Sequence, residues 1–203
     1  MRARAEQIDE TRQRIVAATV ELHGSVGPAA TTISAIADLA NVTRLTVYRH
    51  FPDETALFNA CGAQWMSQQR LPDPDAWEQI SDPADRLRAG LADLYRFYRA
   101  GAEMLANIYR DFTVLPREHQ QLLLDQDNRH NEILARPFRL PSPRRRRLRA
   151  AIGHATLFWT WHSLCIQQGL SDKEAVEIMA GMVAAVLLDR REVPDPDASV
   201  SSR

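Results

Sequence analysis

Residues 31–58 read TTISAIADLANVTRLTVYRHFPDETALF and predict two short helices on a tight turn, followed by the start of a third helix. Thr32 and Thr43 are good N-caps, and each stands before a run with helical spacing of apolar residues. Asn41 falls where the chain must turn sharply, and Asn tolerates the left-handed conformation better than most other residues. Residues 45–50 would then be the second helix of a helix-turn-helix unit, the helix that enters the DNA major groove.

A wider set of residues agrees with this interpretation. In chain order they are Ala18, Leu22, Gly27, Thr32, Ile36, Ala37, Val42, Tyr48, His50-Phe51-Pro52 and Ala56-Leu57-Phe58. In this order and spacing they resemble the N-terminal region of TetR-type transcriptional regulators, and residues 46–51 are the most specific part. The resemblance covers about the first third of the chain. Four positions depart from the pattern: His23 and Pro28 stand where aromatic residues are common, Asn41 where Gly is usual, and Glu54 where Lys is usual.

Nine residues are predicted to contact DNA: Thr32, Ser34, Thr43, Arg44, Leu45, Thr46, Tyr48, Arg49 and His50. Arg44 can donate two hydrogen bonds to guanine, and Leu45 can pack on a thymine methyl group. The hydroxyl and imidazole groups can donate to phosphate and fix the register. Ser34 can sit beside a phosphate at a helix N-terminus, or it can simply face solvent. Arg2 and Arg4 can enter the minor groove, or they can belong to a disordered tail without DNA contact.

The alternative for this region is an ordinary three-helix domain that does not contact DNA. Val47 and Phe51 are predicted to face inward in either case. Glu54 favours a different alternative, a helical ligand-binding or enzymatic protein that has lost operator binding, because the resemblance places Glu54 close to the DNA backbone, where a carboxylate repels phosphate. The charge of the chain does not decide whether this region contacts DNA. The net charge is −1, and residues 1–70 hold seven Arg against seven Asp or Glu.

The composition, with 45% hydrophobic and 25% charged residues, is that of a globular protein. No apolar run approaches the roughly 18–20 residues of a membrane span, and the first residues lack a signal-peptide core, so a cytoplasmic location is predicted. Cys61 and Cys165 lie far apart without metal-ligand spacing, and two buried thiols are expected.

The chain is predicted to be all-α, with a helix-turn-helix DNA-binding domain at residues 1–70. The prolines in residues 71–74 end its last helix. A helical domain for ligand binding and dimerisation follows at residues 71–192, and residues 193–203 are predicted to be a disordered tail.

Helices are predicted near residues 9–25, 53–69, 83–100, 102–112, 116–135, 143–168 and 171–189, besides the two short ones. The last one opens with a capping box between Ser171 and Glu174. Residues 143–189 are expected to form the interface of a homodimer, with Met179, Met182, Val183 and Val186 near its centre.

Aromatic and polar residues on these later helices predict an effector pocket with aromatic walls and a few polar tips. The set is Tyr95, Tyr98, Met104, Tyr109, Phe112, His154, Phe158, Trp159 and His162. The alternative is bundle core together with dimer interface. The resemblance implies that the helical bundle senses a small molecule.

Two other clusters carry weaker signals. Residues 144–149, RRRRLR, can bind an anionic ligand or DNA, or they can be a solvated helix start. Asp127 and His130 lie on one helical face, with Asp125 and Glu132 nearby, but without Cys or a second His we predict no metal site and no cofactor. No catalytic motif is present, so we do not expect an enzyme.

The chain therefore resembles a TetR-type regulator, and the resemblance implies a repressor that binds a palindromic operator as a homodimer and responds to a small molecule. The alternative from another class is a helical ligand-binding or enzymatic protein that has lost operator binding.

Overall fold

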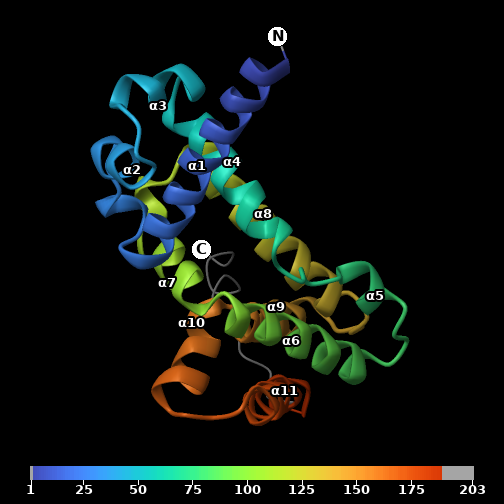
Figure 1. The fold of residues 1–203 in the computed structure, drawn as a ribbon. Coiled ribbons are helices and arrows are strands. Elements are labelled where there is room, and N and C mark those ends of the chain that lie inside the picture. The colour runs from blue at the N-terminus through green and yellow to red at the C-terminus, as the bar shows by residue number, and fades with distance from the viewer. Residues whose placement is uncertain (1, 189–203) are drawn as a thin grey trace, which may run out of the picture. The chain divides into compact units, whose positions relative to one another are not determined.

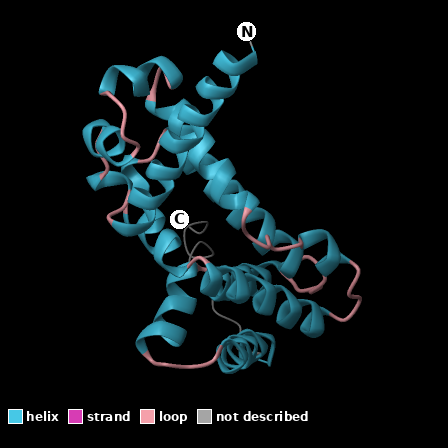
Figure 2. Cartoon of the chain, viewed as in Figure 1, coloured by secondary structure: helices cyan, strands magenta, loops and turns pink. Residues whose placement is uncertain are grey.

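The computed structural model describes the backbone of residues 2–188 and the side chains of residues 7–188. Its elements are α1 (Arg2–Ser25), η1 (Pro28–Ala30), α2 (Ile33–Leu39), α3 (Arg44–His50), α4 (Glu54–Ser67), α5 (Pro74–Glu78), α6 (Pro83–Ala100), α7 (Ala102–Arg110), η2 (Phe112–Val114), α8 (Arg117–Ala135), α9 (Ser142–Thr156), α10 (Phe158–Trp161), η3 (His162–Gln167) and α11 (Asp172–Leu188). No strand occurs in this part of the chain (Figure 2), which confirms the all-α prediction. The predicted contacts of the Arg2 and Arg4 side chains and the predicted tail at residues 193–203 lie outside the described residues.

The described chain forms two compact units. Unit 1 contains residues 2–72 and 96–126, and unit 2 contains residues 73–95 and 127–188. Helices α6 and α8 contribute residues to both units. The domain boundaries predicted at residues 70 and 192 remain predictions.

In unit 1, α4 and α7 pack along α1, and α2 packs against both α1 and α3 (Figure 1). One apolar core joins α1 to α4, with Ile15, Val16, Ala18, Ile36, Ala37, Ala40, Val47, Phe51 and Leu57 all buried. Each fully buried large apolar side chain contributes about 1.5–3 kcal/mol. This core holds α2 and α3 in place, because helices shorter than about 12 residues are marginal in water by themselves.

The N-caps of α2, α3 and α4 lie where the sequence predicts them. The side chains of Thr32, Thr43 and Asp53 each accept a hydrogen bond from the backbone N–H three residues further on, at 3.1, 3.1 and 2.7 Å. Asn41 has a φ of 52°, which confirms the left-handed turn between α2 and α3. Helix α1 extends further than predicted, since it begins at Arg2 and not near residue 9.

In unit 2, α9 packs against α11 (Figure 1). The single long helix predicted over residues 143–168 is wrong: the helix stops at Thr156, and Leu157 is extended, with φ −67° and ψ 138°. The chain then forms α10 and the π-helical turn η3. This break buries both Phe158 and Trp161 in unit 2, and the Trp161 Nε1–H donates to Asp172 Oδ1 at 2.9 Å. Tertiary packing therefore overrides the local helical preference.

The other elements of unit 2 begin with polar caps. The capping box of α11 is confirmed, because the Ser171 N–H donates to Glu174 Oε2 at 2.9 Å and the Glu174 N–H donates to Ser171 Oγ at 3.3 Å. Helix α5 was not predicted from the sequence. Its Trp77 is 3% exposed and donates to Asp93 Oδ2 at 3.1 Å.

Among the described helices, none combines the length and apolarity that crossing a bilayer requires.

Candidate DNA-binding site

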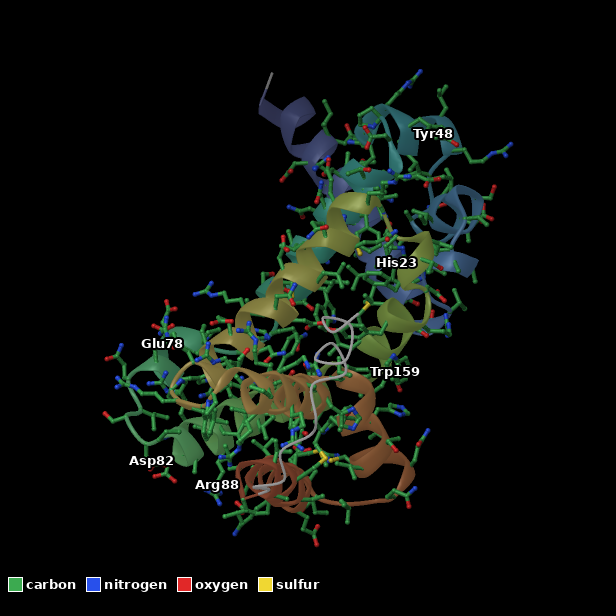
Figure 3. The ribbon with its side chains drawn as sticks, turned by 180° about the vertical axis from the view of Figure 1, so that it is seen from behind. His23, Tyr48, Glu78, Asp82, Arg88 and Trp159 are labelled. Carbon is green, nitrogen blue, oxygen red and sulfur yellow. The ribbon has the colours of Figure 1, made fainter. Side chains whose placement is uncertain are left out.

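Helix α3 has one buried face and one open face. Val47 is fully buried and Phe51 is 2% exposed, which confirms that both face inward. On the other side, Leu45 is 59% exposed and Tyr48, labelled in Figure 3, is 55% exposed. Large apolar side chains that stand next to each other on an exposed surface can mark an interaction site. The open face of α3 is therefore a candidate contact surface.

The polar members of the predicted set occupy this open face and its edge. Thr43, Arg44 and Arg49 are exposed, while Thr46 and His50 are half-buried. The Thr43 and Thr46 hydroxyls lie 2.9 Å apart, so they orient each other. The guanidinium of Arg44 stands on the first turn of α3, where a recognition helix places its base-reading side chains.

On α2, Thr32 and Ser34 are both exposed near the helix N-terminus. The Thr32 side chain already accepts a backbone hydrogen bond as the N-cap, but its hydroxyl hydrogen can still be donated. All nine predicted DNA-contacting residues therefore lie on α2, on α3 or at their N-caps, within unit 1.

Two arginines of α1, whose role could not be predicted from the sequence, support this surface. Arg12 donates to the His50 carbonyl at 3.1 Å and its guanidinium lies 4.2 Å from the centroid of the Phe51 ring. Arg14 donates to the Ala40 carbonyl at 3.2 Å. Both cations therefore satisfy carbonyls at helix C-terminal ends, where positive charge is favourable. The partner carbonyl is 38 residues from Arg12 and 26 residues from Arg14 in the chain, so no local sequence pattern predicts these contacts.

Glu54 is exposed on the first turn of α4, directly after the N-cap Asp53. A carboxylate in the first turn of a helix is favoured by the helix dipole, which gives Glu54 a structural role in the free protein. The same exposure leaves it able to repel phosphate.

The predicted effector-binding residues are divided between the two units. Tyr98, Met104, Tyr109 and Phe112 belong to unit 1, whereas Tyr95, His154, Phe158, Trp159 and His162 belong to unit 2. In unit 2, the rings of Phe158, Trp159 and His162 pack together, with centroids 5.1–5.7 Å apart. Trp159, which is labelled in Figure 3, is 45% exposed, while Phe158 is buried. The Tyr95 hydroxyl donates to the Ala155 carbonyl at 2.7 Å. The set as a whole remains a prediction.

The acidic and histidine cluster on α8 is engaged in packing. Burial raises the pKa of Asp127 to about 6, and burial is also the main cause that lowers the pKa of His130 to about 4. The His130 ring packs on Trp77, and Glu132 pairs with Arg149. No group of three metal-ligating side chains occurs among the described residues.

The basic run at the start of α9 also has partners within unit 2. Arg144 donates to the Leu187 carbonyl near the end of α11, and Arg145 donates to the Leu140 carbonyl. These contacts, with the Arg149–Glu132 ion pair, favour a structural interpretation of the run.

The predicted centre of the dimer interface needs correction. Val183 is fully buried and Met179 is 7% exposed within a single chain, because they face the interior of unit 2. Met182 and Val186 are half-exposed, and Ile178 and Gly181 are exposed. The exposed apolar face of α11 is therefore the one that carries Ile178, Gly181 and Met182.

Comparisons with known proteins agree with this geometry. Residues 15–61 match the profile of bacterial regulatory proteins of the tetR family. Over 70 residues the chain is 39% identical to the "Probable acrEF/envCD operon repressor" of Escherichia coli (strain K12). That alignment covers 34% of this chain, and the chain spans only 30% of the length of this curated relative.

Solved structures extend the likeness of the fold beyond the helix-turn-helix region. A TetR-like transcriptional regulator from Rhodococcus sp. RHA1 has a TM-score of 0.63 at 16% identity, covering 87% of this chain and 95% of that one. NalD, the secondary repressor of the MexAB-OprM multidrug efflux pump in Pseudomonas aeruginosa, has a TM-score of 0.54 at 21% identity, covering 89% and 97%. At these identities the likeness establishes the fold alone.

Proposed function

We propose that the chain is a member of the TetR family of bacterial regulatory proteins and acts as a cytoplasmic transcriptional repressor that binds operator DNA and is released by a small-molecule effector. The observation that carries the proposal is the open face of α3, where exposed Arg44, Leu45 and Tyr48 stand on a helix anchored by buried Val47. The Escherichia coli relative is named as an operon repressor, which supports repression over activation.

In this proposal Arg44 reads a base, because guanidinium to guanine is the commonest specific contact, and Leu45 packs against a thymine methyl group. The other seven residues, Thr32, Ser34, Thr43, Thr46, Tyr48, Arg49 and His50, contact phosphate and fix the register. The protein acts by binding, and no catalytic step is assigned to it.

The protein acts as a homodimer in this proposal. Two recognition helices would then enter successive major grooves about 34–36 Å apart, so the operator would be palindromic. The exposed apolar face of α11, with Ile178 at 47% exposure, is the surface we assign to the subunit contact. The effector would bind in the helical region that follows residue 71 and favour a dimer geometry that no longer fits the operator, which requires that its affinity differ between the two states.

Selection from a random double-stranded DNA library tests the proposal. We expect enrichment of a palindrome whose half-site centres lie one helical turn apart, or a multiple of it, and fluorescence anisotropy should show affinity that falls steeply with salt. A scrambled duplex of equal length is the control. If the selected and scrambled duplexes bind equally at about 0.15 M salt, operator recognition is absent, and the alternative of a helical ligand-binding or enzymatic protein replaces the proposal.

A further inference from the structure

We propose that Asn107, Arg110 and Asp111, at the C-terminal end of α7, form a latch that holds the end of α1 and thereby sets the position of the recognition helix. We name these three residues the α7 latch. They are positioning residues for DNA recognition, so this inference rests on the proposed function.

The latch contacts four residues of the segment that runs from the end of α1 to η1. The Asn107 side-chain amide donates to the His23 and Gly24 carbonyls at 3.0 and 2.7 Å. Arg110 donates to the Val26 carbonyl at 2.9 Å. The Asp111 carboxylate accepts a hydrogen bond from the Ala29 N–H at 3.0 Å. The last carbonyls of a helix have no partner inside the helix, so the two bonds from Asn107 supply what the end of α1 lacks.

The three latch side chains also hold one another. Arg110 reaches both carboxylate oxygens of Asp111, at 2.8 and 3.0 Å, and donates to Asn107 Oδ1 at 2.7 Å. Paired N–H donors on one carboxylate fix its orientation as well as its distance. Asn107 and Asp111 are each 8% exposed. The hydrogen bond from Arg110 holds the pKa of Asp111 below its usual range, which keeps the carboxylate charged.

Gly27 shows how closely the chain is fitted around the latch. Its φ of 92° is one that residues with a side chain rarely adopt. A Cβ added there would lie 2.1 Å from Arg110 Nη2 and 2.5 Å from Asp111 Oδ2. The link between α1 and α2 and the latch therefore occupy one tightly packed site.

The latch is separate from the apolar core of the DNA-binding helices, which is built from residues of α1 to α4. That core folds α2 and α3 onto α1, while the latch ties this group to α7. All of the latch contacts, and the recognition helix α3, lie within unit 1. By fixing where α3 lies relative to α7 within unit 1, this tie would narrow the range of separations that the two recognition helices of a dimer can adopt.

A change in the separation of the two recognition helices can be detected by comparing binding to operators whose half-sites are differently spaced. Inserting one base pair at the centre of the selected palindrome moves the half-sites about 3.4 Å further apart and rotates them about the axis. We compare the Kd values of wild type, Asp111→Ala and Asp111→Asn on the two duplexes. Asn at position 111 keeps an acceptor for the Ala29 N–H but loses the charge, so it should lie between the other two.

The wild type should discriminate strongly against the inserted duplex. Asp111→Ala should bind the native operator more weakly and should reduce the discrimination about tenfold, the size of effect expected for a lost hydrogen bond to a charged group. Gly27→Ala should behave in the same way, because it displaces the same side chains. Gly62→Ala is the control, since a Cβ at Gly62 in α4 meets nothing within 4 Å. A merely structural role would lower the affinity for both duplexes equally, and that result would overturn the latch.

A measurement without DNA separates failure of the latch from failure of the proposed function. Spin labels on cysteines introduced at exposed Leu45 and Glu103, diluted with unlabelled protein, report the distance from α3 to α7 within one chain. The distance distribution should be narrow in the wild type and broader or shifted with Asp111→Ala. An unchanged distribution would refute the latch even if the wild type binds its operator.

Discussion

The exposed face of α11 allows the proposed dimer to be tested without disturbing the subunit. Val183→Arg would not do this, because Val183 is fully buried within one chain and a charge there would unfold it. Gly181 is exposed, and a Cβ at this position meets nothing within 4 Å. We therefore choose Gly181→Arg.

The change should have opposite effects on the subunit and on the dimer. Replacing a glycine inside a helix raises the stability of the subunit by about 0.5–1 kcal/mol. Packed helices lie about 8–10 Å apart, so an Arg between the α11 helices of the two subunits either blocks their approach or is buried without a partner. An uncompensated buried charge costs about 3–5 kcal/mol. Two-fold symmetry places two such charges in each dimer, so the dimer Kd should rise at least about ten-thousandfold.

Sedimentation over a dilution series measures the dimer Kd, and thermal unfolding followed by circular dichroism measures the subunit. The matched control is Gly62→Arg, another helical glycine with open space around its Cβ position, which should leave the dimer Kd unchanged. If Gly181→Arg dimerises as tightly as the wild type, α11 does not form the dimer interface. If the variant unfolds, the assignment of Gly181 to an open surface is wrong.

The remaining predictions concern DNA contacts and pH. Arg44→Ala should cost about 1–3 kcal/mol per half-site on the operator and relax the base preference at one position, measured by binding to single-base variants; uniform weakening would make Arg44 a phosphate contact. Glu54→Lys should tighten binding to specific and non-specific DNA and steepen the log–log salt slope by up to about two units per subunit, and an unchanged slope would mean that the side chain points away from DNA. Burial lowers the pKa of His23 to about 4, below the unfolded value of 6.5. The unfolded state therefore binds more protons below pH 6.5, so stability is full above that pH and falls by about 1.4 kcal/mol per pH unit as the pH drops toward 4. His23→Phe should remove this component in chemical denaturation, and a pH profile equal to that of the wild type would contradict it.

Features that depend on neighbouring residues could be predicted from the sequence. The caps at Thr32, Thr43 and Ser171 each rest on a hydrogen bond to a residue three positions away, and the turn at Asn41 rests on one backbone conformation. The inward face of α3 followed from helical periodicity. Such features are local, so the residue types alone carry the information.

Features that depend on distant contacts could not be predicted in the same way. The break at Leu157 has no Gly or Pro to announce it and comes from the burial of Phe158 and Trp161. Helix α11 carries apolar residues on more than one face. Periodicity does not show which of these faces packs inside the single chain, so Val183 was wrongly predicted to lie in the dimer interface. The amide of Asn107 reaches a carbonyl 83 residues earlier in the chain, a pairing with no local signature.

Helix α3 shows why its supports matter as much as its contact residues. A helix of only seven residues does not hold its own position, and its exposed residues Arg44, Leu45 and Tyr48 contribute little packing. Its position comes instead from buried Val47, and Arg12 fixes its C-terminal end. The residues proposed to read DNA can therefore change the preferred base without changing the fold. Changes in the supports should move the whole reading surface and weaken every contact together.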